Sequence, residues 1–419
     1  MRISSDQILK HNENRLPAHR RRLEALQSEI ANAEEIIRKL IAFQVGIPSW
    51  ALGTGGTRFG RFPGGGEPAA LEQKIEDIGI LHALNRSSGA VSLHIPWDIP
   101  GDPIAAKQLA KELGISFAAM NSNTFQDQHS QKLSYKFGSL CHTNSAVREQ
   151  AIAHNLEVIE NGIKLGSKSI TIWLADGSNF PGQQHFRRAF ERTLGSLKKI
   201  YEKLPDGWKI FTEHKPFEPN FYSSVVPDWG SSLLFAQKLG VKAQCLVDLG
   251  HHLHGSNIEQ VVSRLLMEEK LGGFHFNDSK YADDDLTVGS LRPYQLFLIF
   301  NELVDGMTES DFMEWMIDAS HNVKDPLEDL LQSVEAILLA YAQALCVDRK
   351  RLEDAQENND ATLAQEILQN AFRTDLRPLL AESRLRAGGA FAPVECFREI
   401  QVRKNLIAER GVSARATGL

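Results

Sequence analysis

Short apolar runs alternate with longer amphipathic segments through most of the chain. Near the start, residues from Ser5 to about Leu40 predict helix, interrupted near Pro17, because apolar side chains recur at steps of three and four. The pattern then changes to eight short apolar runs, and nearly every gap between them is long enough for an amphipathic helix. The runs begin at Phe43, Ala90, Ile115, Lys168, Trp208, Ala243, Gly272 and Phe312.

This repeated order of strand and helix predicts a parallel sheet, because parallel neighbours need a crossover connection, usually a helix. Eight strands is the number that closes a (β/α)8 TIM barrel. An open doubly wound sheet is the competing fold, but neither a GxGxxG nor a Walker A motif follows any run, and we favour the barrel. From Pro326 onward only helical patterns follow.

We therefore predict an α/β protein in three parts. These are an N-terminal helical segment over 1–42, a (β/α)8 barrel with the functional site over 43–325, and a C-terminal helical extension over 326–419. The terminal helices either form an outer layer or subunit contact, or merely cover the barrel.

Composition argues against several classes of function. A formal net charge of −7 disfavours nucleic acid as the main partner, because phosphate binding needs a basic face. The four cysteines are far apart and show no CxxC spacing, which disfavours zinc–thiolate sites and a disulfide framework. The polar N-terminus lacks a secretory signal, and the most apolar stretch, from Ala336, is too short to span a bilayer. We expect a cytoplasmic protein with no membrane partner.

Each of the last four strands ends in a side chain that can bind a metal ion. The four are Glu213 after KIFT, Asp248 after QCLV, His275 after GGF, and Asp318 after EWMI. In a parallel barrel the C-terminal ends of the strands converge on one face. A single carboxylate there could cap a helix or lie hydrogen-bonded in the core, but several in one pocket repel one another unless a cation or proton lies between them. The pattern predicts a metal site.

Two nearby segments extend this prediction. His251 follows Asp248 in the short turn DLGHH, which can bring both side chains to one ion. Acidic loops are more often solvated than functional, but the loop NDSKYADDD beside the strand ends is a candidate second half-site. Its acids are Asp278, Asp283, Asp284 and Asp285. Oxygen ligands with one or two imidazoles and no thiolate suit Mn²⁺, Mg²⁺ or Co²⁺ better than structural zinc.

Aromatic residues also gather at strand ends. Trp50, Trp97 and Trp173 end three of the runs, and His94 lies close to Trp97. Any one tryptophan is more often core, but three on the site face suggest a surface on which the apolar face of a sugar could stack. The glycine-rich loop after Trp50, which contains Phe59, lacks the ending of a phosphate-binding loop and predicts a loop that covers the site.

Two further polar residues stand two positions beyond a strand-end ligand. Lys215 follows Glu213 and Ser320 follows Asp318 at that spacing, so each points to the same side as its neighbour if the chain is still extended. A surface role, such as a salt bridge for Lys215, is the alternative, and both interpretations stay open.

Eight segments of the chain, in order, resemble the L-rhamnose isomerases of the broad-specificity bacterial type, which belong to the xylose-isomerase-like barrels. They are PSWALGTGGTRFGRFPG, VSLHIPWD, MNSNTF, DGSNFPGQ, TEHKPFEP, CLVDLGHH, GGFHFNDSKYADDD and MIDASHNV. The resemblance covers nearly the whole chain, and it is least informative after about Gly388.

The resemblance implies two divalent metal ions, most consistent with Mn²⁺. It implies that Glu213, Asp248, His275 and Asp318 hold a structural ion. It also implies that Asp248, His251, Asp283 and Asp285 hold a catalytic ion, with Asp248 shared. Lys215, His94 and Ser320 correspond to residues that handle substrate and protons, and Trp50, Trp97 and Trp173 to the pocket wall. Phe59 corresponds to an aromatic that reaches a neighbouring subunit's pocket in similar proteins, which are tetramers.

The implied reaction interconverts an aldose and a ketose, namely L-rhamnose and L-rhamnulose, with activity on aldoses such as L-lyxose, L-mannose or D-allose. A 1,2-hydride shift, with a proton shuttled near Asp318 and O1 polarised by Lys215, is the mechanism the resemblance implies, and an enediol route uses the same residues. A ketose 3-epimerase, a metal-dependent nuclease or hydrolase on the same barrel, and a non-catalytic scaffold are the competing functions. The second acidic half-site disfavours an epimerase, the net charge disfavours a nuclease, and the set of ligands disfavours a scaffold.

Overall fold

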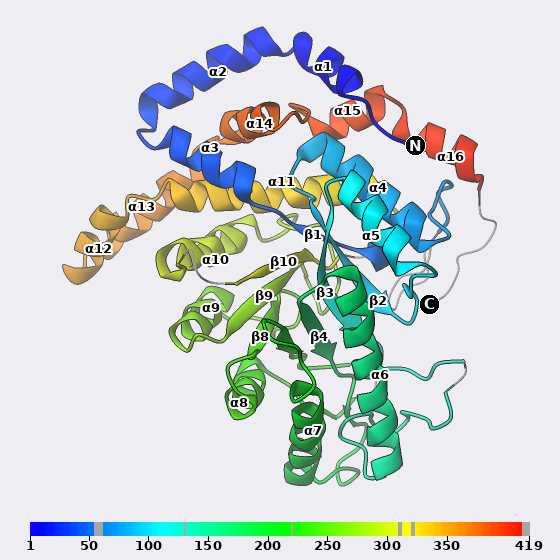
Figure 1. The fold of residues 1–419 in the computed structure, drawn as a ribbon. Coiled ribbons are helices and arrows are strands. Elements are labelled where there is room, and N and C mark those ends of the chain that lie inside the picture. The colour runs from blue at the N-terminus through cyan, green and yellow to red at the C-terminus, as the bar shows by residue number, and fades with distance from the viewer. Residues whose placement is uncertain (54–61, 130, 219–220, 309–311, 320–322, 413–419) are drawn as a thin grey trace.

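The protein is a closed barrel of eight parallel strands surrounded by helices, seen in a computed structural model (Figure 1). The structure describes residues 1–53, 62–129, 131–218, 221–308, 312–319 and 323–412. The barrel strands are β1 (Gly46–Pro48), β2 (Ala90–Ile95), β3 (Ser116–Ser122), β4 (Ser169–Trp173), β6 (Lys209–Glu213), β8 (Ala243–Asp248), β9 (Leu271–Phe276) and β10 (Glu314–Ile317). Each coincides with one of the eight apolar runs, β9 beginning one residue before its run, so the predicted (β/α)8 fold is confirmed.

One helix follows each strand and packs on the outside of the barrel. They are α4 (Leu71–Asn85), α5 (Pro103–Glu112), α6 (Ser145–Leu165), α7 (Phe186–Tyr201), α8 (Trp229–Leu239), α9 (Ile258–Met267), α10 (Pro293–Gly306) and α11 (Pro326–Leu345). Asp102 and Asp325 cap α5 and α11, each followed by a proline whose missing N–H costs nothing in the first turn. Although α11 belongs to the segment predicted as an extension, it packs against α10 and α4 and takes the eighth helix position.

The barrel interior is filled by a small cluster of Ala119, Phe211 and Leu246. The glycine in β9 makes room for it, because a Cβ at Gly272 would lie 2.5 Å from the Phe211 ring. This packed floor leaves the C-terminal ends of the strands as the place where polar side chains can gather. The sequence pattern did not predict a second, two-stranded sheet of β5 (Gly177–Ser178) and β7 (Ser223–Ser224), which joins the loops after β4 and β6.

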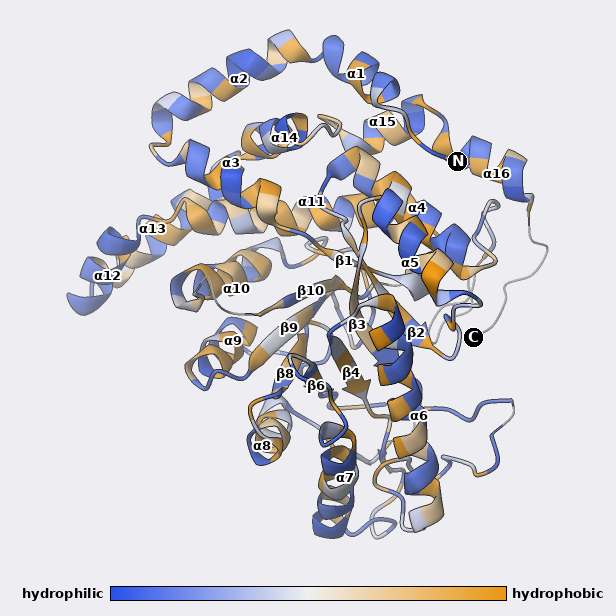
Figure 2. Cartoon of the chain, viewed as in Figure 1, coloured by the Kyte–Doolittle hydropathy of each residue, from blue (hydrophilic) through white to orange (hydrophobic). Residues whose placement is uncertain are grey.

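Helices from both ends of the chain form a layer on one side of the barrel (Figure 1). The N-terminal segment is three helices, α1 (Ser5–Glu13), α2 (Leu16–Glu29) and α3 (Ala33–Ala42), with the expected break before Pro17 and a second break at Ile30. The C-terminal helices are α12 (Arg349–Glu357), α13 (Ala361–Arg373), α14 (Arg377–Arg386), α15 (Pro393–Glu399) and α16 (Val402–Arg410). These helices carry both hydrophobic and hydrophilic residues, and α12 is almost entirely hydrophilic (Figure 2).

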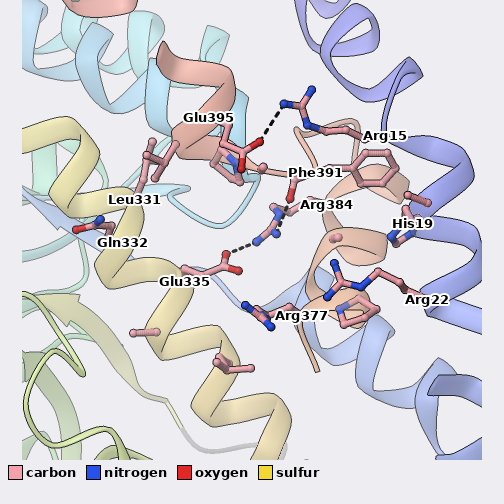
Figure 3. A pocket seen from close by; sticks show the side chains of 18 of the residues that line it. Arg15, His19, Arg22, Leu331, Gln332, Glu335, Arg377, Arg384, Phe391 and Glu395 are labelled. Carbon is pink, nitrogen blue, oxygen red and sulfur yellow. Dashed lines mark hydrogen bonds and ion pairs between the residues drawn. The ribbon is translucent and has the colours of Figure 1, made fainter. Parts of the chain in front are cut away.

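A cavity of about 770 Å³ lies between α2, α11, α14 and α15 (Figure 3). Its arginines are joined to acids and carbonyls on neighbouring helices. Arg384 pairs with Glu335 and donates to the Phe391 carbonyl at 2.8 Å, and Arg15 pairs with Glu395 at 2.9 Å. These contacts tie the two ends of the chain to α11, so the cavity is part of the seam between them.

The last helix, α16, holds two loops on the site side of the barrel. Arg403 pairs with Asp325 at the start of α11 and donates to the Gly65 carbonyl at 3.1 Å. Arg410, whose side chain is 4% exposed, pairs with buried Asp77 of α4 at 2.8 Å and donates to the Gly66 carbonyl. The loop that follows β1 and the segment that follows β10 are therefore anchored to the same helix.

No single described helix is long and apolar enough to cross a membrane, although α11 and α12, bent by 65° at their junction, pass that test as a pair.

Candidate metal centre

Four strand-end residues meet around the imidazole of His275. Its Nδ1 lies 3.3 Å from Glu213 Oε1, 3.6 Å from Asp248 Oδ2 and 3.5 Å from Asp318 Oδ2. Strand register produces this meeting, because Asp248 stands directly beside His275 in the sheet, and Asp318 follows the last paired residue of β10. The structure thus brings together the four residues that the strand pattern singled out.

The donor set fits a divalent cation. Ligand atoms that lie about 2.1 Å from one ion stand about 3.0–3.4 Å apart, close to the separations around His275. Asp248 Oδ2 and His275 Nε2 are buried and have no hydrogen-bond partner in the described part of the chain. Two groups of possible ligands share one carboxylate: Glu213, Asp248 and His251, and Asp248, His275 and Asp318, each with ligand atoms within 4.8 Å of one another.

The second half-site is also assembled. His251 Nδ1 lies 3.1 Å from Glu213 Oε1 and its Nε2 lies 3.3 Å from Asp283 Oδ1. Asp283 and Asp285 line the same cavity as His251 and Asp318, although 35 residues separate Asp283 from Asp318 in the chain. Three imidazole or carboxylate residues from the turn and the loop therefore adjoin the strand-end cluster.

The other two acidic residues of this loop accept hydrogen bonds from the backbone. Asp284 Oδ2 accepts from the backbone amides of Lys280 and Tyr281, and Asp278 Oδ2 accepts from those of Leu291 and Arg292. Both shape the loop, so only Asp283 and Asp285 of the four are directed to the cavity.

Lys215 lies in the site and not on the surface. Its side chain is 2% exposed, and its Nζ lies 2.7 Å from Asp283 Oδ2, 2.5 Å from Glu218 Oε1 and 5.2 Å from the centre of the Trp173 ring. The surface salt bridge considered as an alternative is therefore wrong. A buried ammonium beside two carboxylates and above an aromatic face is a fixed positive charge at the edge of the cavity.

Aromatic rings form part of the wall of the cavity. Trp50, His94 and Trp173 line it, and Trp97 packs behind His94 with ring centres 4.7 Å apart. Phe125 fills the space between His94 and Trp173, 5.6 and 4.6 Å away. Phe59 and Ser320, also predicted as site residues, lie outside the described residues.

The residue-by-residue prediction missed Phe125 and Asn121, which both line the cavity. Their segment, MNSNTF after β3, was available as a signal, because it ends a strand run on the site face. The hydrogen bond from Trp50 Nε1 to Asp318 Oδ1, 2.8 Å long, was not anticipated either.

The pKa values of the two carboxylates Glu213 and Asp318 are shifted in opposite directions. Burial opposes ionisation of Glu213, but His275 and His251 outweigh it and lower the pKa of this acid. For Asp318, burial raises the pKa to about 7, and the neighbouring carboxylates of Asp285 and Asp248 act in the same direction. Burial also lowers the pKa of His94 to about 4, so this ring is neutral at pH 7. Without a cation, the cluster holds protons that a cation would displace.

A probable sugar isomerase of Rhizobium meliloti is 54% identical to this chain and aligns over 99% of it and 98% of its own length. A second probable sugar isomerase, from Mesorhizobium japonicum, is 53% identical over 97% of this chain and 96% of its own. The chain belongs to the family of these probable sugar isomerases. A xylose isomerase of Thermus thermophilus is a more distant match to this chain, at 25% identity over 58% of this chain and 64% of that one.

Among solved structures, an L-ribulose 3-epimerase superposes on this protein with a TM-score of 0.55, over 72% of this chain and 96% of that one. The identity is 14%, so this likeness shows the barrel fold alone. No family model matches the chain.

Proposed function

We propose that this protein is a metal-dependent aldose–ketose isomerase that interconverts L-rhamnose and L-rhamnulose and also accepts aldoses such as L-lyxose, L-mannose or D-allose. The observation that carries the proposal is the cluster of buried Glu213, Asp248 and His275 with half-buried Asp318 beneath an aromatic wall, with Lys215 at its edge. The rhamnose specificity follows from the resemblance of the eight quoted segments.

In this proposal each subunit holds two divalent ions, Mn²⁺ in preference to Co²⁺ or Mg²⁺. The residues that would hold the first ion are Glu213, Asp248, His275 and Asp318. Those for the second are Asp248, His251, Asp283 and Asp285. When bound, the two ions supply Lewis acidity toward the oxygens of the open-chain sugar.

The protein's own groups then account for the rest of the reaction. The hydrogen on C2 moves to C1, the proton on O2 leaves, and O1 gains a proton, so an aldehyde at C1 becomes an alcohol and C2 becomes a ketone. Asp318, a carboxylate that can accept a proton or a hydrogen bond beside the sugar oxygens, takes part in moving the proton between O2 and O1. Lys215 donates to O1 and stabilises negative charge on it.

The remaining residues bind and enclose the sugar. Neutral His94 and Ser320 hydrogen-bond to sugar hydroxyls, while Trp50 and Trp173 pack against the apolar face of the sugar and exclude water. Trp97 supports this pocket wall from behind His94. Phe59 contributes to the pocket of a neighbouring subunit in a cytoplasmic homotetramer. The mass of the purified protein in solution, measured by light scattering, tests that assembly.

One experiment tests the reaction. The protein is stripped with a chelator, Mn²⁺ is restored, and ketose formation is measured from L-rhamnose beside a panel of aldoses and ketoses. We expect conversion of L-rhamnose that depends on Mn²⁺. Absence of metal-dependent conversion of any aldose would refute the isomerase, and conversion of ketose to ketose alone would establish an epimerase instead.

A further inference from the structure

Asp98 joins three segments behind the site. It is 1% exposed and lies in the turn after β2, where its Oδ2 accepts from the backbone amide of His94 at 2.8 Å and from the hydroxyl of Ser49. Its Oδ1 accepts from Lys74 Nζ of α4 at 2.7 Å. A buried carboxylate with this many donors is fixed in place, because losing any one of them leaves a charge poorly compensated.

Ser49 connects the fixed Asp98 carboxylate to the metal centre. It is fully buried and begins a short 3₁₀ turn, η1 (Ser49–Ala51), whose next residue is Trp50. The indole of Trp50 is 9% exposed and donates from Nε1 to Asp318 Oδ1 at 2.8 Å. One oxygen of Asp318 is thereby held by the indole, while the other, Oδ2, faces His275 at 3.5 Å.

A carboxylate held by one oxygen presents the other in a defined direction. Hydrogen bonds to the outer atoms of metal ligands orient the ligands and tune their affinity for the ion. The Asp318 backbone is also fixed, since its amide donates to the Phe276 carbonyl at 2.9 Å. The side-chain rotation that remains is the one that the Trp50 indole restricts.

We infer that Asp98, Ser49 and Trp50 are positioning residues that act in series to hold Asp318 in the orientation that binds the metal ion. The inference rests on the proposed function, because it takes Asp318 as a metal ligand. It gives Trp50 a second role beside that of a pocket wall, and it gives Asp98 and Ser49, which do not line the cavity, a role in the site.

The test measures binding of Mn²⁺ alone, by calorimetry or by the electron paramagnetic resonance signal of free Mn²⁺, with no sugar present. Trp50→Phe keeps a ring and removes the N–H, and we expect it to raise the dissociation constant for Mn²⁺ about 10-fold, the low end of the range for such outer hydrogen bonds. Ser49→Ala and Asp98→Asn should weaken binding in the same direction. Because the three act in series, Ser49→Ala combined with Trp50→Phe should weaken Mn²⁺ binding no more than Trp50→Phe alone.

Trp97→Phe is the matched control, since it makes the same change in a wall tryptophan that stacks on His94 and has no bond to Asp318 in the described structure. Its dissociation constant for Mn²⁺ should stay within about twofold of the unmodified protein, as expected for a residue outside the ligand network. The inference is overturned if Trp50→Phe binds Mn²⁺ normally, if Trp97→Phe weakens binding equally, or if the effects of Ser49→Ala and Trp50→Phe add.

Thermal unfolding of each metal-free variant checks its fold, and if Asp98→Asn does not fold, Ser49→Ala still tests that end of the series by removing a single hydroxyl. Failure of the proposed function is read separately. Normal Mn²⁺ binding without sugar conversion would refute the isomerase and leave the positioning role measurable, whereas no Mn²⁺ binding by the unmodified protein would refute both.

Discussion

At the scale of single residues, Asp318 is where most of the site's interactions meet. It is bonded to Trp50, faces His275, and lies near three other carboxylates in a buried setting that raises its pKa to about 7. His275 beside it has the opposite character. Burial opposes its charge, but Glu213, Asp248 and Asp318 raise the pKa of this imidazole well above its ordinary value. The metal-free cluster therefore binds protons on the same groups that we propose as metal ligands.

This arrangement predicts that Mn²⁺ binding releases protons in a number that depends on pH. A bound ion needs neutral His275 and ionised Asp318, so release should fall from about two protons at pH 6 to about one at pH 8, as Asp318 loses its proton beforehand. Calorimetry in buffers of different ionisation enthalpy measures the number. Since the folded-state pKa of Asp318 is raised from 3.8, its contribution to the stability of the metal-free protein is present below that value and is lost as pH rises through about 7.

Asp318→Asn is the control for that measurement. The amide carries no titratable proton, so proton release should stay near one across the same range while Mn²⁺ affinity falls. An unchanged fall from two protons to one in Asp318→Asn would show that another group releases the second proton.

Lys215 gives a second prediction at this scale. Replacing it by methionine keeps the length of the side chain and removes the charge that we place against O1, so turnover should fall about 100- to 1000-fold, the range for loss of one donor to a developing oxyanion. Lys238→Met, at an exposed position of α8, is the matched control and should retain full turnover. Initial rates of ketose formation at saturating sugar compare the two. Equal rates in both variants would remove Lys215 from the mechanism.

How much of the site could be predicted from the sequence depends on how each residue is held. Four of the site residues stand at strand ends, namely Glu213, Asp248, His275 and Asp318. Parallel strands in register bring their ends together, so locating the strands in the sequence was enough to predict that these residues meet. Asp283 and Asp284 are neighbours in a loop, where no period tells which carboxylate turns to the cavity and which accepts backbone amides. Contacts between distant segments, such as Trp50 with Asp318, depend on three-dimensional packing and leave no local signal.

At the scale of elements, the sequence predicted which segments form strands better than it predicted where helices begin and end. All eight runs formed strands, and most of their residues are buried, as a barrel between an inner core and outer helices requires. The two-residue strands β5 and β7 are too short to show alternation, so only their pairing reveals them. The break at Ile30 between α2 and α3 has no proline, in contrast to the break before Pro17, and the helices on both sides of it pack against α14.

Helix packing on the barrel predicts opposite effects for the same substitution in two helices. Gly162 lies in α6, where an added Cβ would stand 2.7 Å from Trp208 Cη2 and 2.8 Å from Met120 Cγ. Gly162→Ala should therefore lower the free energy of unfolding by about 1–3 kcal/mol, through overpacking between α6 and the barrel. In α7, nothing lies within 4 Å of a Cβ at Gly195, and Gly195→Ala should raise that free energy by about 0.5–1 kcal/mol through helix propensity.

Chemical or thermal unfolding of the two variants, side by side, provides the measurement. The same sign of change in both would contradict the packing argument, because helix propensity alone favours alanine at each position.

At the scale of the whole molecule, the two ends of the chain enclose one side of the barrel and reach toward its site. The Met1 amine pairs with Glu409 of α16 at 2.9 Å, and α16 in turn anchors the loop after β1 and the start of α11 through Arg403 and Arg410. The helical ends therefore fix Gly65 and Gly66 in the loop after β1 and Asp325 at the start of α11.

Because the ligands that we propose come from four strands and two loops and converge on one cluster, metal binding should stabilise the whole barrel and not one segment of it. Binding to the folded state alone at 100 times the dissociation constant contributes about 2.7 kcal/mol, which should raise the melting temperature by several degrees. Unfolding followed by circular dichroism, with chelator and then with Mn²⁺ in excess, measures the shift. Glu213→Gln keeps the size of the side chain but removes a ligand charge, so its melting temperature should respond far less to Mn²⁺. An identical shift in Glu213→Gln would mean that the stabilising ion binds elsewhere and not at the cluster around His275.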